Sequence, residues 1–213
     1  MACPICEKRS AKRYCPAKGA AICAVCCGTE REVTISCPSD CPHLIAARRY
    51  DEEHRKPLAP EEVPYPDVRF SSDLVHEHRP VISGLGFTVL KFVAEEPSLD
   101  DSDVMAAVGA LAETYRTLGS GIYYEKPPDG PLRHALYAKL AEFLQQCKEK
   151  DAQQASFTRL KDGEIFFLLV FLLRVGRSQT SGRPKSRAFL DFLRAQFPPL
   201  PELQREEPRI IAP

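Results

Sequence analysis

Eight of the nine cysteines in this 213-residue chain fall within its first 41 residues. Four of them form two C-x2-C doublets, CPIC and CAVC, which are separated by 16 residues. Two residues between thiolates let both sulfurs face one tetrahedral ion, and two such doublets about 15 to 20 residues apart are typical of zinc sites. The spacing therefore predicts a first zinc site. Its ligands are Cys3, Cys6, Cys23 and Cys26.

The remaining clustered cysteines can complete a second site. Cys37 and Cys41 form a C-x3-C pair at the start of an expected helix over residues 37–55, and the two sites would interleave as a cross-brace. Cys26 and Cys27 are adjacent, and we expect them to point to different ions, as neighbours do in an extended segment. The spacing indicates the eight cysteine ligands more directly than it indicates which four of them share each ion. The second site comprises Cys15, Cys27, Cys37 and Cys41, with His43 as a reserve ligand.

Structural zinc is the chemistry that this cysteine pattern favours. A segment of about 55 residues with few apolar side chains is marginal without a staple, and structural zinc supplies on the order of 10 to 16 kcal/mol in small fingers. A catalytic zinc keeps an open position and usually takes a His or carboxylate ligand, whereas eight thiols close both sites. Two alternatives stay open. One is an iron–sulfur cluster, although the bunched C-x2-C-x2-C run is missing; the other is a disulfide framework, which a reducing compartment disfavours.

The order CPIC, KRYCP and ICAVCC, followed by a helix with later ligands, resembles the small cross-brace zinc fingers of the HIT and B-box type. The resemblance covers residues 3–54. The chain has Ala17, Lys18 and Gly19 where the HIT pattern has another cysteine, and Cys37 and Cys41 where that pattern ends in His-Cys. The resemblance implies a protein-interaction module or assembly platform. The rest of the chain resembles no family of known function.

Other residues with potential chemistry have simpler interpretations. The HEH motif places His76 and His78 at i and i+2, whereas metalloprotease histidines stand at i and i+4 of one helix. We expect His54 on a helix surface, and Cys147 as a small core residue, since no His or Asp can be assigned to activate it. No acid–base pair, phosphate-binding glycine loop or nucleophile motif appears. We therefore expect neither an enzyme nor a small-molecule substrate.

A nucleic-acid-binding regulator is the alternative function. Four basic residues lie close together: Lys8, Arg9, Lys12 and Arg13. The whole chain balances 29 basic against 29 acidic residues, so only this local stretch is basic. Residues 1–56 hold ten Lys and Arg against seven Asp and Glu, but two Zn²⁺ ions and eight thiolates would bring that charge to about −1. Tyr14 and Tyr50 are the few aromatic side chains there that could stack on bases, whereas a groove for single strands combines basic residues with several aromatics. We therefore expect a protein partner.

Composition divides the chain into four parts. A cysteine-rich finger occupies residues 1–56, and a linker with four prolines, expected to be stiff and extended, occupies 57–66. An α-helical domain over 67–197 is followed by a proline-rich tail over 198–213 that we expect to be disordered. The fold class is thus a small zinc-stabilised cross-brace domain followed by an all-α bundle of about five helices. Periodicity and capping signals place these helices at 80–96, 98–121, 130–150, 161–177 and 184–197.

The longest apolar run, Ile165 to Leu173, is shorter than the roughly 20 residues that a bilayer requires, so we expect it in the core of the bundle. With no secretory signal in the sequence, we expect a cytoplasmic protein. The loop with Tyr123 and Tyr124 could anchor a partner or fold back onto the bundle. The PPLP sequence at 198–201 would suit a polyproline-binding module.

Overall fold

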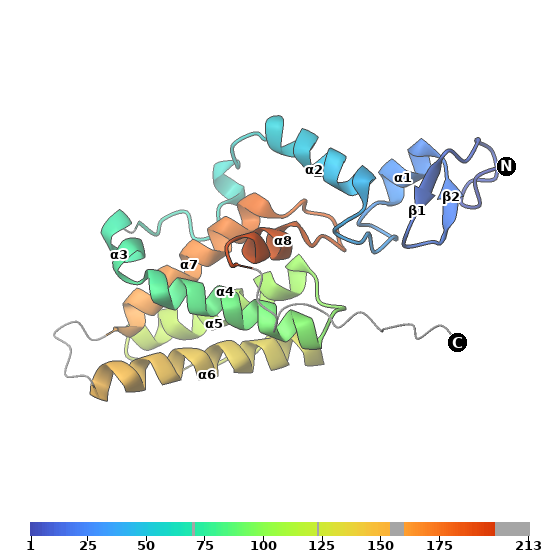
Figure 1. Cartoon of the computed structure of the whole chain (residues 1–213). Helices are drawn as coiled ribbons and strands as arrows, with labels where there is room; N and C mark the ends of the chain where they lie inside the picture. The colour runs from blue at the N-terminus through green and yellow to red at the C-terminus, as the bar shows by residue number, and fades with distance from the viewer. Residues whose placement is uncertain (70, 123, 154–159, 199–213) are drawn as a thin grey trace, which may run out of the picture.

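The structure is a computed structural model that describes residues 1–69, 71–122, 124–153 and 160–198. These residues form eight α-helices, one short 3-10 turn and one two-stranded sheet (Figure 1). The expectation of a mostly helical chain is confirmed. None of the described helices combines the length and the apolar character required to cross a membrane.

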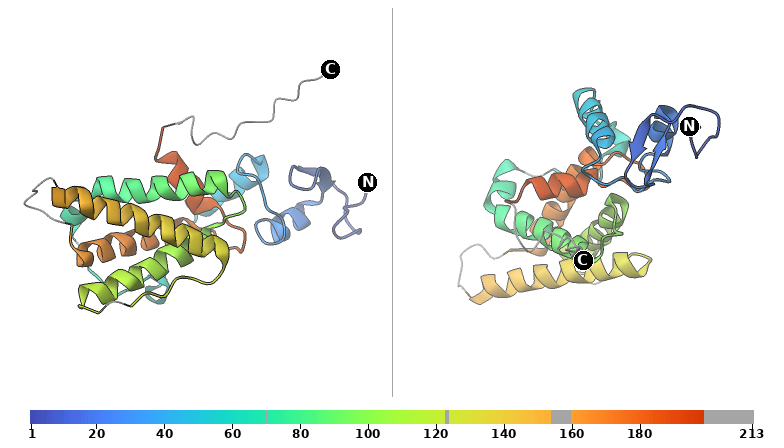
Figure 2. Two further views of the ribbon diagram at one scale, coloured as in Figure 1. Left: turned by 90° about the horizontal axis from the view of Figure 1, so that it is seen from below. Right: turned by 45° about the vertical axis from the view of Figure 1, so that its right-hand side comes forward.

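The N-terminal segment is built on a small hairpin. Strands β1 (Arg13–Cys15) and β2 (Ala20–Ile22) pair antiparallel, with Tyr14 opposite Ala21. Gly19 closes the turn at φ +61°, a left-handed conformation that glycine adopts without strain. Helix α1 (Ala24–Glu30) follows β2 directly, and α2 (Pro42–Glu53) begins with a proline in its first turn. Figures 1 and 2 show the hairpin and α1 beyond one end of the helical bundle.

Cys26 and Cys27 lie in helix α1, so the expectation of an extended segment at these two residues is wrong. The seven-residue helix AVCCGTE has one buried residue, Cys26, and therefore carries no amphipathic pattern that would reveal it in the sequence. Adjacent side chains on a helix are rotated by about 100°, because a turn has 3.6 residues. The two thiols therefore still point in different directions.

Six helices form the second part of the chain. They are α3 (Ser72–Glu77), α4 (Arg79–Glu95), α5 (Asp101–Gly119), α6 (Pro131–Gln153), α7 (Asp162–Gln179) and α8 (Ala188–Ala195). Helices α4 to α8 correspond to the five expected ones, and Asp100 is the N-cap of α5. The additional helix, α3, has six residues and is capped by the Ser71 hydroxyl, which accepts a hydrogen bond from the Leu74 N–H.

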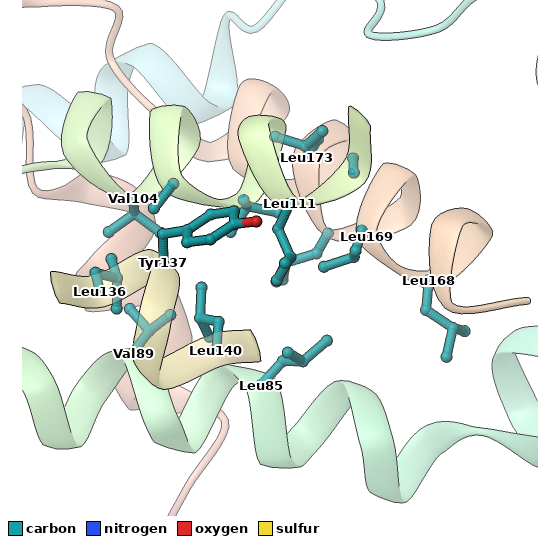
Figure 3. Packing of buried hydrophobic residues seen from close by; sticks show 14 of the residues in the cluster. Leu85, Val89, Val104, Leu111, Leu136, Tyr137, Leu140, Leu168, Leu169 and Leu173 are labelled. Atoms are coloured by element: carbon teal, nitrogen blue, oxygen red, sulfur yellow. The ribbon is translucent and has the colours of Figure 1, made fainter. Parts of the chain in front are cut away.

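Helices α4, α5, α6 and α7 share one apolar core. Figure 3 shows Val89, Leu111, Leu140 and Leu169, one from each helix, meeting in it. All four side chains are buried, and the apolar run of α7 lies in the core as expected. Asp101 is also buried, and hydrogen bonds from the Ser186 hydroxyl and from the N–H groups of Phe189 and Leu190 in the first turn of α8 compensate its loss of solvation. The helices thus have a core that includes no residue of the cysteine-rich segment.

The proline-rich segment at 57–66 is not a free spacer. It contains a short 3-10 turn, Pro60–Glu62, and the Arg174 guanidinium on α7 donates to the carbonyl oxygens of Pro64 and Tyr65. The Tyr65 hydroxyl donates to the Glu113 carboxylate, and its ring meets Phe166 edge-on at 5.4 Å between centroids. Prolines lack the N–H but keep the carbonyl, so an arginine on the neighbouring helix is a suitable donor for this segment.

Candidate metal centre

The CPIC doublet lies in a loop that its own backbone closes. The Cys3 N–H donates to the Arg9 carbonyl at 2.8 Å, and the Glu7 N–H donates to the Cys3 carbonyl at 2.7 Å. Glu7 has φ +54°, so the chain reverses sharply just after Cys6. This tight turn brings the two sulfurs of the doublet to the same side of the loop.

The CAVC doublet lies at a strand-to-helix junction. Cys23 follows β2 and is the N-cap of α1, where its sulfur accepts a hydrogen bond from the Cys26 N–H at 3.3 Å. The first turn of α1 then carries Cys26 back toward the sulfur of Cys23. An extended strand and a helical turn together produce the same sulfur arrangement that the first loop achieves by a sharp reversal.

The two doublets converge on one point. The sulfur atoms of Cys3, Cys6, Cys23 and Cys26 all lie within 4.8 Å of one another, and those of Cys6 and Cys23 are 3.9 Å apart. Sulfurs bound at about 2.3 Å to a tetrahedral ion are separated by about 3.8 Å. The four cysteines of the first predicted site therefore lie close enough to hold a metal ion.

The environment of this group fits a cation. The backbone N–H groups of Lys8 and Arg9 hydrogen-bond to the Cys6 sulfur and lower its pKa to about 6. Burial, followed by hydrogen bonding with the neighbouring thiols, raises the pKa of Cys26 to about 12. Four thiolates this close therefore need a positive ion among them to ionise together, and a bound metal deprotonates coordinating thiols outright.

The second cysteine set is less tightly gathered. Within the described parts of the chain, the sulfurs of Cys15, Cys27, Cys37 and Cys41 do not form a group as compact as the first. Burial raises the pKa of Cys37, and the charges of Cys41 and Cys15 act in the same direction, so these thiols lie near it. Cys15 ends β1, Cys27 lies on α1, and Cys41 is the N-cap of α2. The second site stays a prediction.

The histidines and the ninth cysteine lie outside the compact group. His43 is half-buried on α2, and its carbonyl accepts a hydrogen bond from Arg31. His54 is exposed and stacks on Tyr50, as expected for a helix surface. His76 lies on α3 and His78 follows that helix. Cys147 is half-buried against the core of the bundle, and burial raises its pKa.

The basic residues of the alternative function lie on the surface. Lys8, Arg9 and Lys12 are exposed, and Arg13 is half-buried in β1. Tyr14 is 64% exposed on the outer face of the hairpin. In the loop after α5, Tyr123 lies outside the described residues, and Tyr124 is 57% exposed, so its side chain is not folded into the core.

Sequence reasoning missed the residues that join the cysteine-rich segment to the bundle. Glu32 is only 3% exposed, at φ +55°, and its carboxylate accepts hydrogen bonds from Arg48 on α2 and from Ser181 after α7. Arg48 also pairs with Asp191 on α8. The Glu32 N–H donates to the Ile35 carbonyl, and Glu32 also influences the pKa of Cys37, so this residue lies near a cysteine of the second set as well as at the bundle interface.

Comparison with known proteins finds no matching family, no similar curated protein and no similar solved structure.

Proposed function

We propose that this chain is a non-catalytic zinc protein whose cysteine-rich finger holds two structural zinc ions and binds a protein partner. The observation that carries the proposal is the compact group of four thiols, which contains no His or carboxylate. Four thiolates complete a tetrahedral zinc sphere and leave no position for water or substrate. The second ion would take the other four cysteines, Cys15, Cys27, Cys37 and Cys41, of which Cys15 and Cys41 are buried.

Exposed apolar side chains on the finger support a protein partner. Ile5 in CPIC is 39% exposed and Val25 in CAVC is 47% exposed. Each immediately precedes a cysteine of the compact group, so the two side chains lie near the same metal position. Apolar side chains held at fixed positions by a metal site can contribute to binding without a large loss of conformational entropy. The basic residues nearby would favour a partner with acidic groups around an apolar contact.

The bundle would then serve as the support for the finger. Arg183 donates to the carbonyls of Gly28 and Arg31, and the Lys185 N–H donates to the carbonyl of Glu32. These contacts fix the segment that follows α1. A finger held in this way presents its outer surface in one orientation, which suits an interaction or scaffold protein.

Paired variants test the partner surface. Ile5→Asp with Val25→Asp places two charges at the metal knuckles, whereas Ile45→Asp with Tyr50→Asp places two on exposed apolar positions of α2. Both variants should keep the zinc content of the wild type. Cross-linking mass spectrometry of complexes from the native source should show one set of partners lost with the knuckle variant and retained with the α2 variant. Equal capture by both variants would contradict this binding surface.

Nucleic-acid binding is the second candidate, favoured by the exposed Tyr14 ring next to Lys12 on the same outer face of the hairpin. An aromatic side chain with neighbouring cations can stack on a base while the cations contact phosphates. Charge reversal distinguishes the two functions, because every thiol stays in place. The reversed residues are Lys8, Arg9, Lys12 and Arg13. A phosphate-binding surface requires strongly salt-dependent RNA or DNA binding by the wild type and its loss in the reversed variant. A protein interface requires changed association rates while much of the affinity survives.

A further inference from the structure

An apolar groove lies on the bundle, away from the cysteine-rich segment. Helices α3, α4, α7 and α8 enclose it, and its volume is about 670 Å³. Clefts of roughly 300 to 1,000 Å³ are the usual size of ligand sites. Its apolar lining includes Val75, Ile82, Phe171, Val175, Phe192 and Phe197. Helix α4 contacts both α3 and α8, and α8 also contacts α7, so the four helices are adjacent.

The polar residues of the groove lie toward solvent. Asp73, His76 and Arg79 are exposed and of mixed charge, so they do not select a strongly charged ligand. Ser83, on the outer side of α4, is also exposed and lines the groove. The site is therefore suited to apolar side chains presented by an extended polar segment.

The described part of the chain ends beside this groove. Helix α8 ends at Ala195, Phe197 contributes to the lining, and the described part of the chain ends at Pro198. Residues 199–213 therefore start at the edge of the groove. Three extended residues span at most about 10 Å, so Leu200 is within reach of the lining around Phe197.

The sequence after Phe197 suits this position. It reads PPLPEL, with apolar residues at Leu200 and Leu203. Prolines favour the polyproline II conformation, which has three residues per turn and would place these two leucines on one edge about 9 Å apart. A segment restricted by prolines loses less conformational entropy on binding than a flexible one.

We propose that residues 199–213 bind in this groove of their own chain, with Leu200 and Leu203 against its apolar lining. Because the segment is tethered to the groove wall, its effective concentration is in the range of about millimolar, so a weak interaction suffices. This interaction is independent of the finger and of its metal. A protein that uses the groove would have to displace the segment first.

Tryptophan fluorescence of the full chain tests the proposal, because the natural sequence contains no tryptophan. Leu203→Trp places a single reporter at a proposed contact, and Arg205→Trp places one on the same segment at a polar position. The first should give blue-shifted emission and severalfold weaker acrylamide quenching than the second. Leu200→Trp provides a second reporter at the other proposed contact.

Matched second substitutions show where the reporter binds. In the Leu203→Trp protein, Ser83→Glu puts a charge in the groove, whereas Ala138→Glu puts the same charge on an exposed position of α6, outside it. We expect Ser83→Glu to restore quenching to the level of Arg205→Trp and Ala138→Glu to leave it low, with far-UV circular dichroism unchanged in both. Full quenching of both leucine reporters in the absence of a second substitution would overturn the proposal. The proposal would also be overturned if Ser83→Glu left acrylamide quenching of the reporter weak. Weak quenching that is lost on dilution would overturn it as well, because a second copy of the chain would then supply the segment.

Discussion

The Nη2 atom of Arg48 lies 2.8 Å from Oε1 of Glu32, where α2 meets the loop that follows α1. The other terminal nitrogen of the same guanidinium lies 2.5 Å from Asp191 on α8. Glu32 is buried, whereas Arg48 and Asp191 are each about one-fifth exposed. Arg48 thus links Glu32, within the cysteine-rich segment, to Asp191 on the bundle, and the neighbourhood of Cys37 depends on contacts far along the chain.

Arg48→Met should destabilise the native protein, because it leaves the buried Glu32 carboxylate without its cation. Removing one partner of a buried pair costs about 3 to 5 kcal/mol, and we expect the lower end because Arg48 is partly exposed. Thermal or denaturant unfolding measures the loss. Arg49→Met is the control, because Arg49 forms an exposed i,i+4 pair with Glu53 that is worth less than about 1 kcal/mol. Equal losses of unfolding free energy in the two variants would show that the contact between Arg48 and Glu32 does not stabilise the protein.

Asp101→Ala should also destabilise the bundle. The Asp101 carboxylate accepts hydrogen bonds from the N–H groups of Phe189 and Leu190 and from the Ser186 hydroxyl, all three of them buried interactions. Losing the acceptor leaves buried donors without a partner, which costs about 2 to 3 kcal/mol. Ser102→Ala, at the next and exposed position, should change the unfolding free energy by less than about 0.5 kcal/mol. A similar loss in both variants would contradict this role of Asp101.

Acid should weaken the contact between Tyr65 and Glu113. Burial opposes ionisation of Glu113, but hydrogen bonds from Tyr65 and Arg116 outweigh it and hold its pKa below the ordinary value of 4.5. A carboxyl whose pKa is lower in the folded state stabilises the protein above its unfolded pKa and loses that contribution as the pH falls through the folded value. The wild type should therefore lose more stability between neutral pH and pH 3 than Tyr65→Phe, measured by denaturant unfolding. Parallel pH profiles would contradict this assignment.

Chelation should affect the two parts of the chain differently. Residues 3–27 have little apolar core besides the cysteines, whereas α4 to α8 have a core of their own. Hydrogen exchange after metal removal should show lost protection in residues 3–27 and retained protection in α5 and α7. We expect an intermediate loss in α2, which keeps its contact with Asp191. Simultaneous loss of protection in α5 and α7 would mean that the metal supports the whole fold.

The sequence predicted features that local patterns encode. Helices α4 to α8 follow from apolar periodicity and capping signals, and the convergence of Cys6 with Cys23 follows from two C-x2-C doublets. The contact between Arg48 and Asp191 joins residues 143 positions apart and leaves no local pattern. The prolines at 57–66 predict a stiff backbone but give no information on its packing, which depends on hydrogen bonds from Arg174.

Metal content measured on single-site variants tests the central claim most directly. Elemental analysis of protein purified without chelator should find two zinc ions per chain in the wild type and in Cys147→Ser, whose sulfur lies outside the cysteine cluster. Cys6→Ser should retain one ion, because it removes a ligand from the compact group only. Iron in place of zinc, or an unchanged zinc content in Cys6→Ser, would contradict the proposed structural zinc finger.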